Sequence, residues 1–285
     1  MNLIALLAAL AADAWSLRLP AWRERVPLAA AAGAAARLPW PADPTARAVL
    51  LVLPLPLAVG LAQWLLAGLL GGLASLLLAA LVLALALGPG PLWREVDGWL
   101  AARACGDEAG AAEAAAALGR DLPQATVADT ILVEAVRRLF APLLWFLVLG
   151  PVGAALYRCA WWLALRAPDG TAGAEVREAA RRLLWLLDWL PARGTALAYA
   201  LAGSFDETLA GWRCFARRSA DPGRGATEEL LVCTGRGALG LVGDDGEVTA
   251  DPSAEAVRRA RDLVRRAVVV WVTAVALLTL GGWIA

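Results

Sequence analysis

The charged residue with the most demanding surroundings is Arg158. It lies within residues 139–165, an apolar stretch that carries no other charge and is interrupted at Gly150-Pro151. A guanidinium in such a stretch is costly unless a carboxylate meets it. Acidic residues are available on both sides, at Glu134 and at Asp188. We expect Arg158 to pair with one of these two carboxylates and so to form a polar site that could hold a small ligand.

Glu134 also has basic neighbours close by in the sequence. Arg137 and Arg138 follow it, and residues four apart lie side by side on a helix, so a Glu134–Arg138 pair is available. One interpretation is an interfacial helix with paired charges. In the other, Glu134 faces inward and meets Arg158. The spacing supports both interpretations.

A second polar cluster lies at residues 188–193, with the sequence DWLPAR. Proline removes a helical hydrogen bond, so Pro191 is expected to end the preceding helix and to set the direction of Arg193. Asp188 and Arg193 would then either clamp this turn or line a pocket. A phosphate or a carboxylate would suit such a pocket, because the guanidinium fork binds both groups.

A weaker signal is Gly119-Arg120-Asp121, which follows an Ala-rich segment expected to be helical at residues 111–118. Arg120 could bind an anionic group and Asp121 a metal ion. The alternative is that both are solvated surface charges, as most charged residues are.

Several other chemistries are excluded by composition. The chain has no His, and its 26 basic residues are all Arg, which excludes His bases, His ligands, Lys Schiff bases and Walker-type loops. The four cysteines are far apart and predict isolated thiols. Residues 235–240 fit G-x-G-x-x-G but lack the context of a nucleotide loop, and a formal net charge of zero does not suggest nucleic acid. We predict no catalytic residue and no metal site.

The elements that must position these side chains are membrane helices. Hydrophobic residues make up 60% of the 285-residue chain and lie in blocks, which is typical of membrane proteins. We predict an all-α polytopic membrane protein with about four transmembrane or re-entrant helices, plus interfacial and cytoplasmic amphipathic helices, in a single domain, residues 1–285. The membrane segments are expected at about 48–67, 71–88, 139–165 and 267–284, with a possible re-entrant segment at 194–203.

The third segment is expected to break at Gly150-Pro151, because proline suits the first turn of a new helix. The two half-helices would either continue across the bilayer or return to the same side. A return would place both Arg-rich flanks on the cytoplasmic side, as the positive-inside rule prefers. Residues 1–15 are expected to form a retained interfacial helix, and residues 220–252 to be the least ordered part.

Several of these residues lie in motifs of a known family. Four stretches, together with the chain length and the positions of the hydrophobic segments, resemble the AmpE family of inner-membrane proteins associated with β-lactamase induction. These stretches are FAPLLW (140–145), GPVG (150–153), Tyr157-Arg158 and LDWLPAR (187–193). AmpE is similar in turn to the CbiB/CobD membrane proteins, which act late in cobalamin synthesis and use ATP and Mg²⁺.

The motifs of those synthases are present only in part. The synthases carry Asp-Gly shortly before the pair that corresponds to Ala141-Pro142, where this chain has Arg137 and Arg138. Their Asp pair ahead of the tryptophan–proline motif is replaced by Leu184 and Trp185. A reaction of Mg²⁺–ATP needs carboxylates to hold the metal. The resemblance therefore implies that the synthase reaction is lost and that a ligand pocket persists.

The resemblance implies a multi-pass regulatory protein of the bacterial inner (cytoplasmic) membrane, linked to β-lactamase induction or to cell-wall stress. Its partners would be the lipid bilayer and a cell-wall metabolite or a regulatory protein. The alternatives are an ATP- and Mg²⁺-dependent ligase of the CbiB class and a structural membrane protein without a small ligand. The expected pocket residues are Arg120, Asp121, Glu134, Tyr157, Arg158, Asp188 and Arg193.

Overall fold

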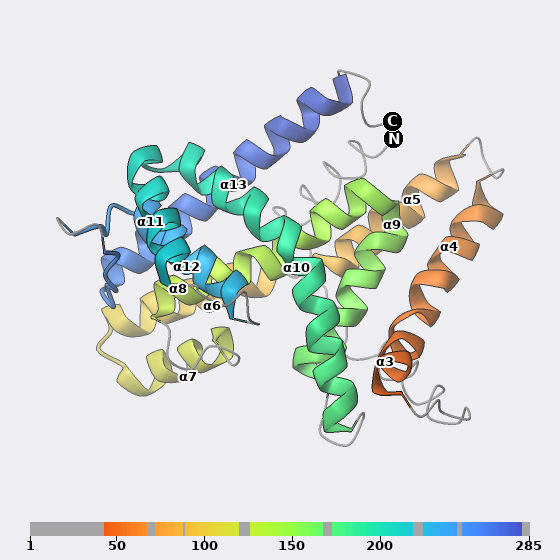
Figure 1. Ribbon diagram of the computed structural model, residues 1–285, viewed down its shortest axis with the longest axis horizontal. Helices are drawn as coiled ribbons and strands as arrows, with labels where there is room; N and C mark the ends of the chain where they lie inside the picture. The colour runs from red at the N-terminus through yellow and green to blue at the C-terminus, as the bar shows by residue number, and fades with distance from the viewer. Residues whose placement is uncertain are drawn as a thin grey trace. The chain divides into compact units, whose positions relative to one another are not determined.

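The computed structural model describes residues 43–67, 72–87, 89–119, 126–167, 173–218, 225–243 and 247–280. Within these ranges the chain is helical (Figure 1), apart from turns and an isolated antiparallel bridge between Val242 and Val248. The expected all-α class is confirmed. The interfacial helix expected at residues 1–15 and the pocket residues Arg120 and Asp121 lie outside the described ranges.

The chain divides into two compact units. The first unit takes the described residues before position 88 and those from Ala141 to Leu187. The second takes those from Pro89 to Phe140 and those after Leu187, up to residue 280. A single domain over residues 1–285 stays a prediction.

The first unit is built on helices α3 (Pro44–Val52), α4 (Pro54–Leu66), α5 (Leu73–Ala86) and α9 (Ala141–Trp161), which continues into the π-helical segment η4 (Trp162–Arg166). Asp43 caps α3 by accepting the Ala46 N–H at 3.0 Å. Pro54 has no N–H to continue the helical hydrogen bonds, and α3 gives way to α4 at Leu53, whose backbone stays in the right-handed helical region. Helix α9 packs against both α4 and α5.

The outer faces of α4 and α5 carry large apolar side chains. On α4, Leu57, Leu61, Trp64 and Leu65 recur at helical spacing and expose between 58% and 74% of their surface. On α5 the exposed leucines recur at every fourth position, at Leu73, Leu77, Leu81 and Leu85. A soluble protein seldom exposes such continuous apolar stripes. This arrangement fits a surface that contacts lipid.

Two helical stretches are long and apolar enough to cross a membrane, Pro44–Leu66 and Val127–Arg166. They contain the segments expected at 48–67 and 139–165. Helix α5, expected at 71–88, has 14 residues, fewer than the roughly 20 that a span requires. The segment expected at 267–284 is described as far as residue 280, as the C-terminal half of α13 (Ala254–Leu280). The structure supports a membrane protein without confirming about four spans.

The break expected at Gly150-Pro151 is confirmed. Gly150 has φ 67° and ψ −155°, a conformation open essentially to glycine alone, and it interrupts α9. In a continuous helix Trp145 and Gly153 would be about 12 Å apart along the axis. Here a Cβ added at Gly153 would lie 2.9 Å from the Trp145 carbonyl carbon. The second half-helix therefore turns back toward the first.

The second unit contains the other described helices. They are α6 (Pro89–Ala104), α7 (Glu108–Leu118), α8 (Val127–Ala135), the π-helical segment η3 (Val136–Phe140), α11 (Phe205–Arg218), α12 (Ala226–Ala238) and α13. Thr126 begins α8 with a capping box, in which Asp129 accepts the Thr126 N–H at 3.1 Å and donates its own N–H to Thr126. Ser253 caps α13 by accepting the Ala256 N–H.

The helix end expected at Pro191 is wrong, because α10 (Ala174–Ala202) runs through this proline. Pro191 has no N–H to offer the Leu187 carbonyl, and Trp145 Nε1 donates to that oxygen instead, at 3.0 Å. Thr195 Oγ1 donates to the Pro191 carbonyl at 2.8 Å. The substitute bond satisfies the freed carbonyl, and residues 195–202 continue α10. The possible re-entrant segment at 194–203 stays a prediction.

The expectation that residues 220–252 are the least ordered is wrong for Ala226–Ala238, which form α12. Glycine lowers helix propensity, but here it allows close packing. A Cβ on Gly211 of α11 would lie 2.9 Å from the Cys233 carbonyl carbon, and one on Gly237 of α12 would lie 2.9 Å from the Thr208 Cα. The motif at residues 235–240 therefore belongs to a packed helix end and not to a nucleotide loop.

Candidate functional site

The centre of the second unit is a buried network of charged side chains around Glu134. Arg138 Nε donates to one carboxylate oxygen of Glu134 at 2.7 Å, and Arg137 Nη1 lies 3.5 Å from the other. The side chains of all three residues expose 7% of their surface or less. The i,i+4 pair expected between Glu134 and Arg138 is confirmed. The π-helical segment η3, which carries both arginines, is a feature often found at functional sites.

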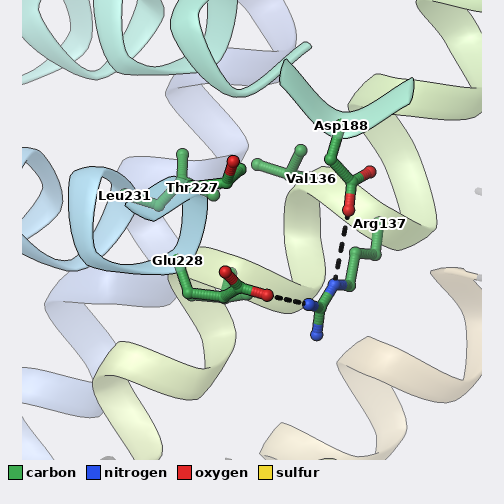
Figure 2. Close-up of a pocket in the computed structure, with 7 residues that line it drawn as sticks. Val136, Arg137, Asp188, Thr227, Glu228 and Leu231 are labelled. Carbon is green, nitrogen blue, oxygen red and sulfur yellow. Dashed lines mark hydrogen bonds and ion pairs between the residues drawn. The ribbon is translucent and has the colours of Figure 1, made fainter. Parts of the chain in front are cut away.

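The two arginines connect Glu134 to other helices. Arg138 Nη1 donates to Glu95 of α6 at 2.7 Å. Arg137 donates to Glu228 of α12, and its Nε lies 3.8 Å from an oxygen of Asp188 on α10 (Figure 2). Asp188 is also buried, with 7% of its side chain exposed. Four carboxylates from four helices thus converge on two adjacent guanidinium groups.

A small recess lies beside Arg137. Its lining residues are Val133, Val136, Arg137, Asp188, Thr227, Glu228 and Leu231 (Figure 2). The recess leaves essentially no space for a molecule as large as water, whereas ordinary small-molecule sites measure roughly 300–1,000 Å³. The ion-paired side chains themselves fill this space, which leaves little room for a nucleotide or a corrinoid.

A second buried ion pair lies in the same unit. Arg236 donates to both carboxylate oxygens of Asp129, from Nε at 2.9 Å and from Nη2 at 2.7 Å. The hydrogen bond to Asp129 raises the pKa of Arg236 further above its usual range. Two-point geometry of this kind gives the strongest guanidinium–carboxylate contacts. The pair fixes α12 to the start of α8, which carries Glu134 further along.

The structure brings together two of the expected pocket residues, Glu134 and Asp188, through their shared contact with Arg137. Tyr157 is fully buried in the first unit. Arg158, also in the first unit, stacks on the Trp161 ring with its Cζ 4.2 Å from the ring centroid. Because Arg158 and the two carboxylates belong to different units, the expected ion pair stays a prediction.

Arg193 has a role in its own helix. Its Cζ lies 3.9 Å from the centroid of the Trp189 ring, and its Nη1 donates to the Trp189 carbonyl at 3.1 Å. Burial lowers the pKa of Arg193 relative to the usual value. The residue therefore packs along α10, and Asp188 pairs with Arg137 of η3.

Four members of these networks were missed from the sequence, namely Glu95, Asp129, Glu228 and Arg236. Glu95 is 43 positions from its partner Arg138, and Glu228 is 91 positions from Arg137, so no local pattern connects them. Asp129 could have been found as the acidic third residue of a capping box that starts at Thr126. Among the described residues, no group of three or more His, Cys, Asp or Glu is arranged to hold a metal ion.

Comparisons with known proteins place these features in a family context. A family model described as "Regulatory signalling modulator protein AmpE" matches residues 42–285. The "Cobalamin biosynthesis protein CobD" of Chromobacterium violaceum is 37% identical over 161 residues, which are 55% of this chain and 46% of that protein. The protein of the same name from Stutzerimonas stutzeri is 33% identical over 172 residues, 55% of this chain and 54% of that protein. The chain thus spans about half the length of these curated relatives. No solved structure matches it significantly.

Proposed function

The chain belongs to the AmpE family, and we propose that it is a multi-pass regulator in the bacterial inner membrane that acts in β-lactamase induction or in the response to cell-wall stress. It acts without catalysing a reaction of its own. The family match and the apolar helices support the location, and the charge network supports the absence of catalysis.

The observation that carries this proposal is that Arg137 and Arg138 form ion pairs with the buried carboxylates. Glu134, Glu95, Asp188 and Glu228 each contact one or both guanidinium groups. By resemblance, these arginines stand where the CbiB/CobD synthases carry Asp-Gly. A guanidinium pair neutralises carboxylates that a Mg²⁺–ATP reaction would need as metal ligands. In this chain those carboxylates hold helices together instead.

Induction in cells tests the regulatory role. In a host with an inducible β-lactamase, the gene for this chain is deleted and nitrocefin hydrolysis is measured before and after exposure to a β-lactam inducer. We expect the deletion to change the induced activity and the wild-type chain to restore it. Arg137→Gln should fail to restore the activity, whereas Arg258→Gln, which removes an equal charge from an exposed pair, should restore it. Unchanged induction in the deletion strain would refute the proposal.

Fractionation tests the location separately. The full chain should sediment with inner membranes, remain there after carbonate washing and be released by detergent, as a protein with embedded helices does. Release by carbonate would contradict the membrane location without bearing on the induction result.

The identity to two proteins named for cobalamin biosynthesis favours one alternative, an ATP- and Mg²⁺-dependent ligase of the CbiB class. Detergent-purified protein is mixed with Mg²⁺–ATP, adenosylcobyric acid and aminopropanol phosphate, and nucleotide binding and ATP turnover are measured. The proposed function predicts neither. Turnover that depends on all three components would establish the ligase and overturn the non-catalytic reading.

A further inference from the structure

The first unit contains a second cluster of polar groups, centred on Trp161. This side chain exposes 6% of its surface, and its indole Nε1–H has no hydrogen-bond partner in the described part of the chain. Arg158 and Arg166 both lie over its ring, with Cζ atoms 4.2 Å and 5.1 Å from the centroid. The Nε of Arg166 is likewise buried without a partner among the described residues.

A local departure from α-helical geometry places Arg166 there. In an α-helix, residues five apart do not share a face. The segment Trp162–Arg166 is π-helical, and the Ala167 N–H donates to the Trp162 carbonyl, five residues earlier, at 2.8 Å. This wider turn brings Arg166 round to the side of Trp161. A π-helical turn is an unusual conformation that often marks a functional site.

The unsatisfied groups in this cluster are all donors. A buried donor without a partner destabilises the fold, so two such groups beside two guanidinium ions call for a ligand that supplies acceptors. A third guanidinium lies close by, because Arg177 Nη2 donates to the Ala167 carbonyl at 3.3 Å. Negative charge with several acceptor oxygens is the matching chemistry.

We infer that Trp161, Arg158 and Arg166 form a binding site for a phosphate group. The guanidinium groups contact its oxygens, and the indole N–H and the Arg166 Nε–H gain the acceptor that they lack. Arg166 ends the apolar stretch Val127–Arg166, and the end of a membrane helix is where lipid headgroups lie. The phosphate can belong to an anionic lipid headgroup or to a free phosphate ion. The site does not depend on the proposed function.

Binding by the full chain in detergent tests the inference with three probes. Dioctanoyl phosphatidic acid and dioctanoylglycerol differ by the phosphate alone, and inorganic phosphate carries the same group without acyl chains. Native mass spectrometry and the shift in melting temperature report binding. We expect phosphatidic acid to bind and dioctanoylglycerol not to bind. Binding of inorganic phosphate as well would identify a free ion as a sufficient ligand.

Three variants assign that binding to the site. Arg166→Gln should weaken binding roughly tenfold or more, because it removes a charge-assisted hydrogen bond. Trp161→Phe keeps an aromatic ring and removes the N–H, and it should weaken binding about threefold. Arg258→Gln, at an exposed ion pair in the other unit, is the matched control and should bind as the wild type does.

Two results would overturn the inference. One is equal binding of phosphatidic acid and dioctanoylglycerol, which would show that the acyl chains alone are recognised. The other is unchanged affinity in both Arg166→Gln and Trp161→Phe, which would place the phosphate elsewhere. If Arg166→Gln does not fold, Trp161→Phe decides, because it leaves the charge unchanged and keeps an aromatic side chain.

Discussion

Removing the charge of Glu134 should destabilise the protein far more than removing the charge of an exposed glutamate. The Glu134 side chain exposes 3% of its surface and accepts from Arg138 Nε at 2.7 Å, with Arg137 Nη1 at 3.5 Å. Breaking a buried ion pair by removing one partner costs about 3–5 kcal/mol. Glu134→Gln keeps one acceptor oxygen and the shape of the side chain, so we expect it to lower the free energy of unfolding by about 2–3 kcal/mol.

The matched control is Glu255→Gln. Glu255 pairs with Arg258 at 3.3 Å, but 66% of its side chain is exposed. Exposed pairs contribute about 0–1 kcal/mol. On the usual scaling of 2–4 °C per kcal/mol for chains of 150–250 residues, Glu134→Gln should lower the melting temperature by roughly 4–12 °C and the control by at most about 4 °C.

Buried cysteines make the assay direct. Cys159, Cys214 and Cys233 are buried and Cys105 is exposed, so a Cys105→Ser background leaves thiols that a maleimide dye reaches after unfolding. Burial also raises the pKa of the Cys233 thiol to about 12, which keeps it unreactive near neutral pH in the folded state. A melting temperature for Glu134→Gln within about 1 °C of the control would refute the argument that this network stabilises the second unit.

Three further predictions follow from single contacts. Gly153→Ala should disrupt the turn in α9, since its Cβ would lie 2.7 Å from the Leu149 Cβ. The control is Gly98→Ala, whose Cβ meets nothing within 4 Å, so this variant should be neutral or slightly stabilising. Dye-monitored melting compares the two variants. Trp145→Phe removes the donor to the Leu187 carbonyl and should lower stability by about 1–3 kcal/mol in the same assay. A maleimide reagent should modify Cys105 alone in the folded protein and all four thiols in dodecyl sulfate; modification of more than one folded thiol would contradict the burial.

Local patterns in the sequence predicted the local parts of the structure. The spacing of Glu134 and Arg138 made their ion pair available, and Gly150-Pro151 predicted the break in α9. Each depends on residues at most four positions apart, where helix geometry alone fixes which groups meet. The match to the AmpE family over residues 42–285 also confirms the resemblance carried by the motifs.

Tertiary contacts overrode the local patterns elsewhere. Pro191 does not end α10, because an indole N–H from Trp145 satisfies the carbonyl that proline leaves free. Gly235 and Gly237 lie within α12 although glycine disfavours helix, because their lack of a side chain allows α12 to pack closely against α8 and α11. The acidic partners of the arginines, Glu95 and Glu228, come from helices distant in sequence. A pattern confined to one segment cannot contain such information.

The two candidate sites share a structural device, although they lie in different units. The apolar stretch Val127–Arg166 contains two π-helical segments, η3 and η4, and each carries arginines of one candidate site. In η3 the adjacent residues Arg137 and Arg138 both reach Glu134, and in η4 Arg166 reaches Trp161. A π-helical turn shifts the residues after it round the helix, so it can direct an arginine inward while the rest of the outer face stays apolar. Residues 128–140, which include all of η3, are buried on every side, so the guanidinium groups there meet carboxylates of neighbouring helices and not lipid.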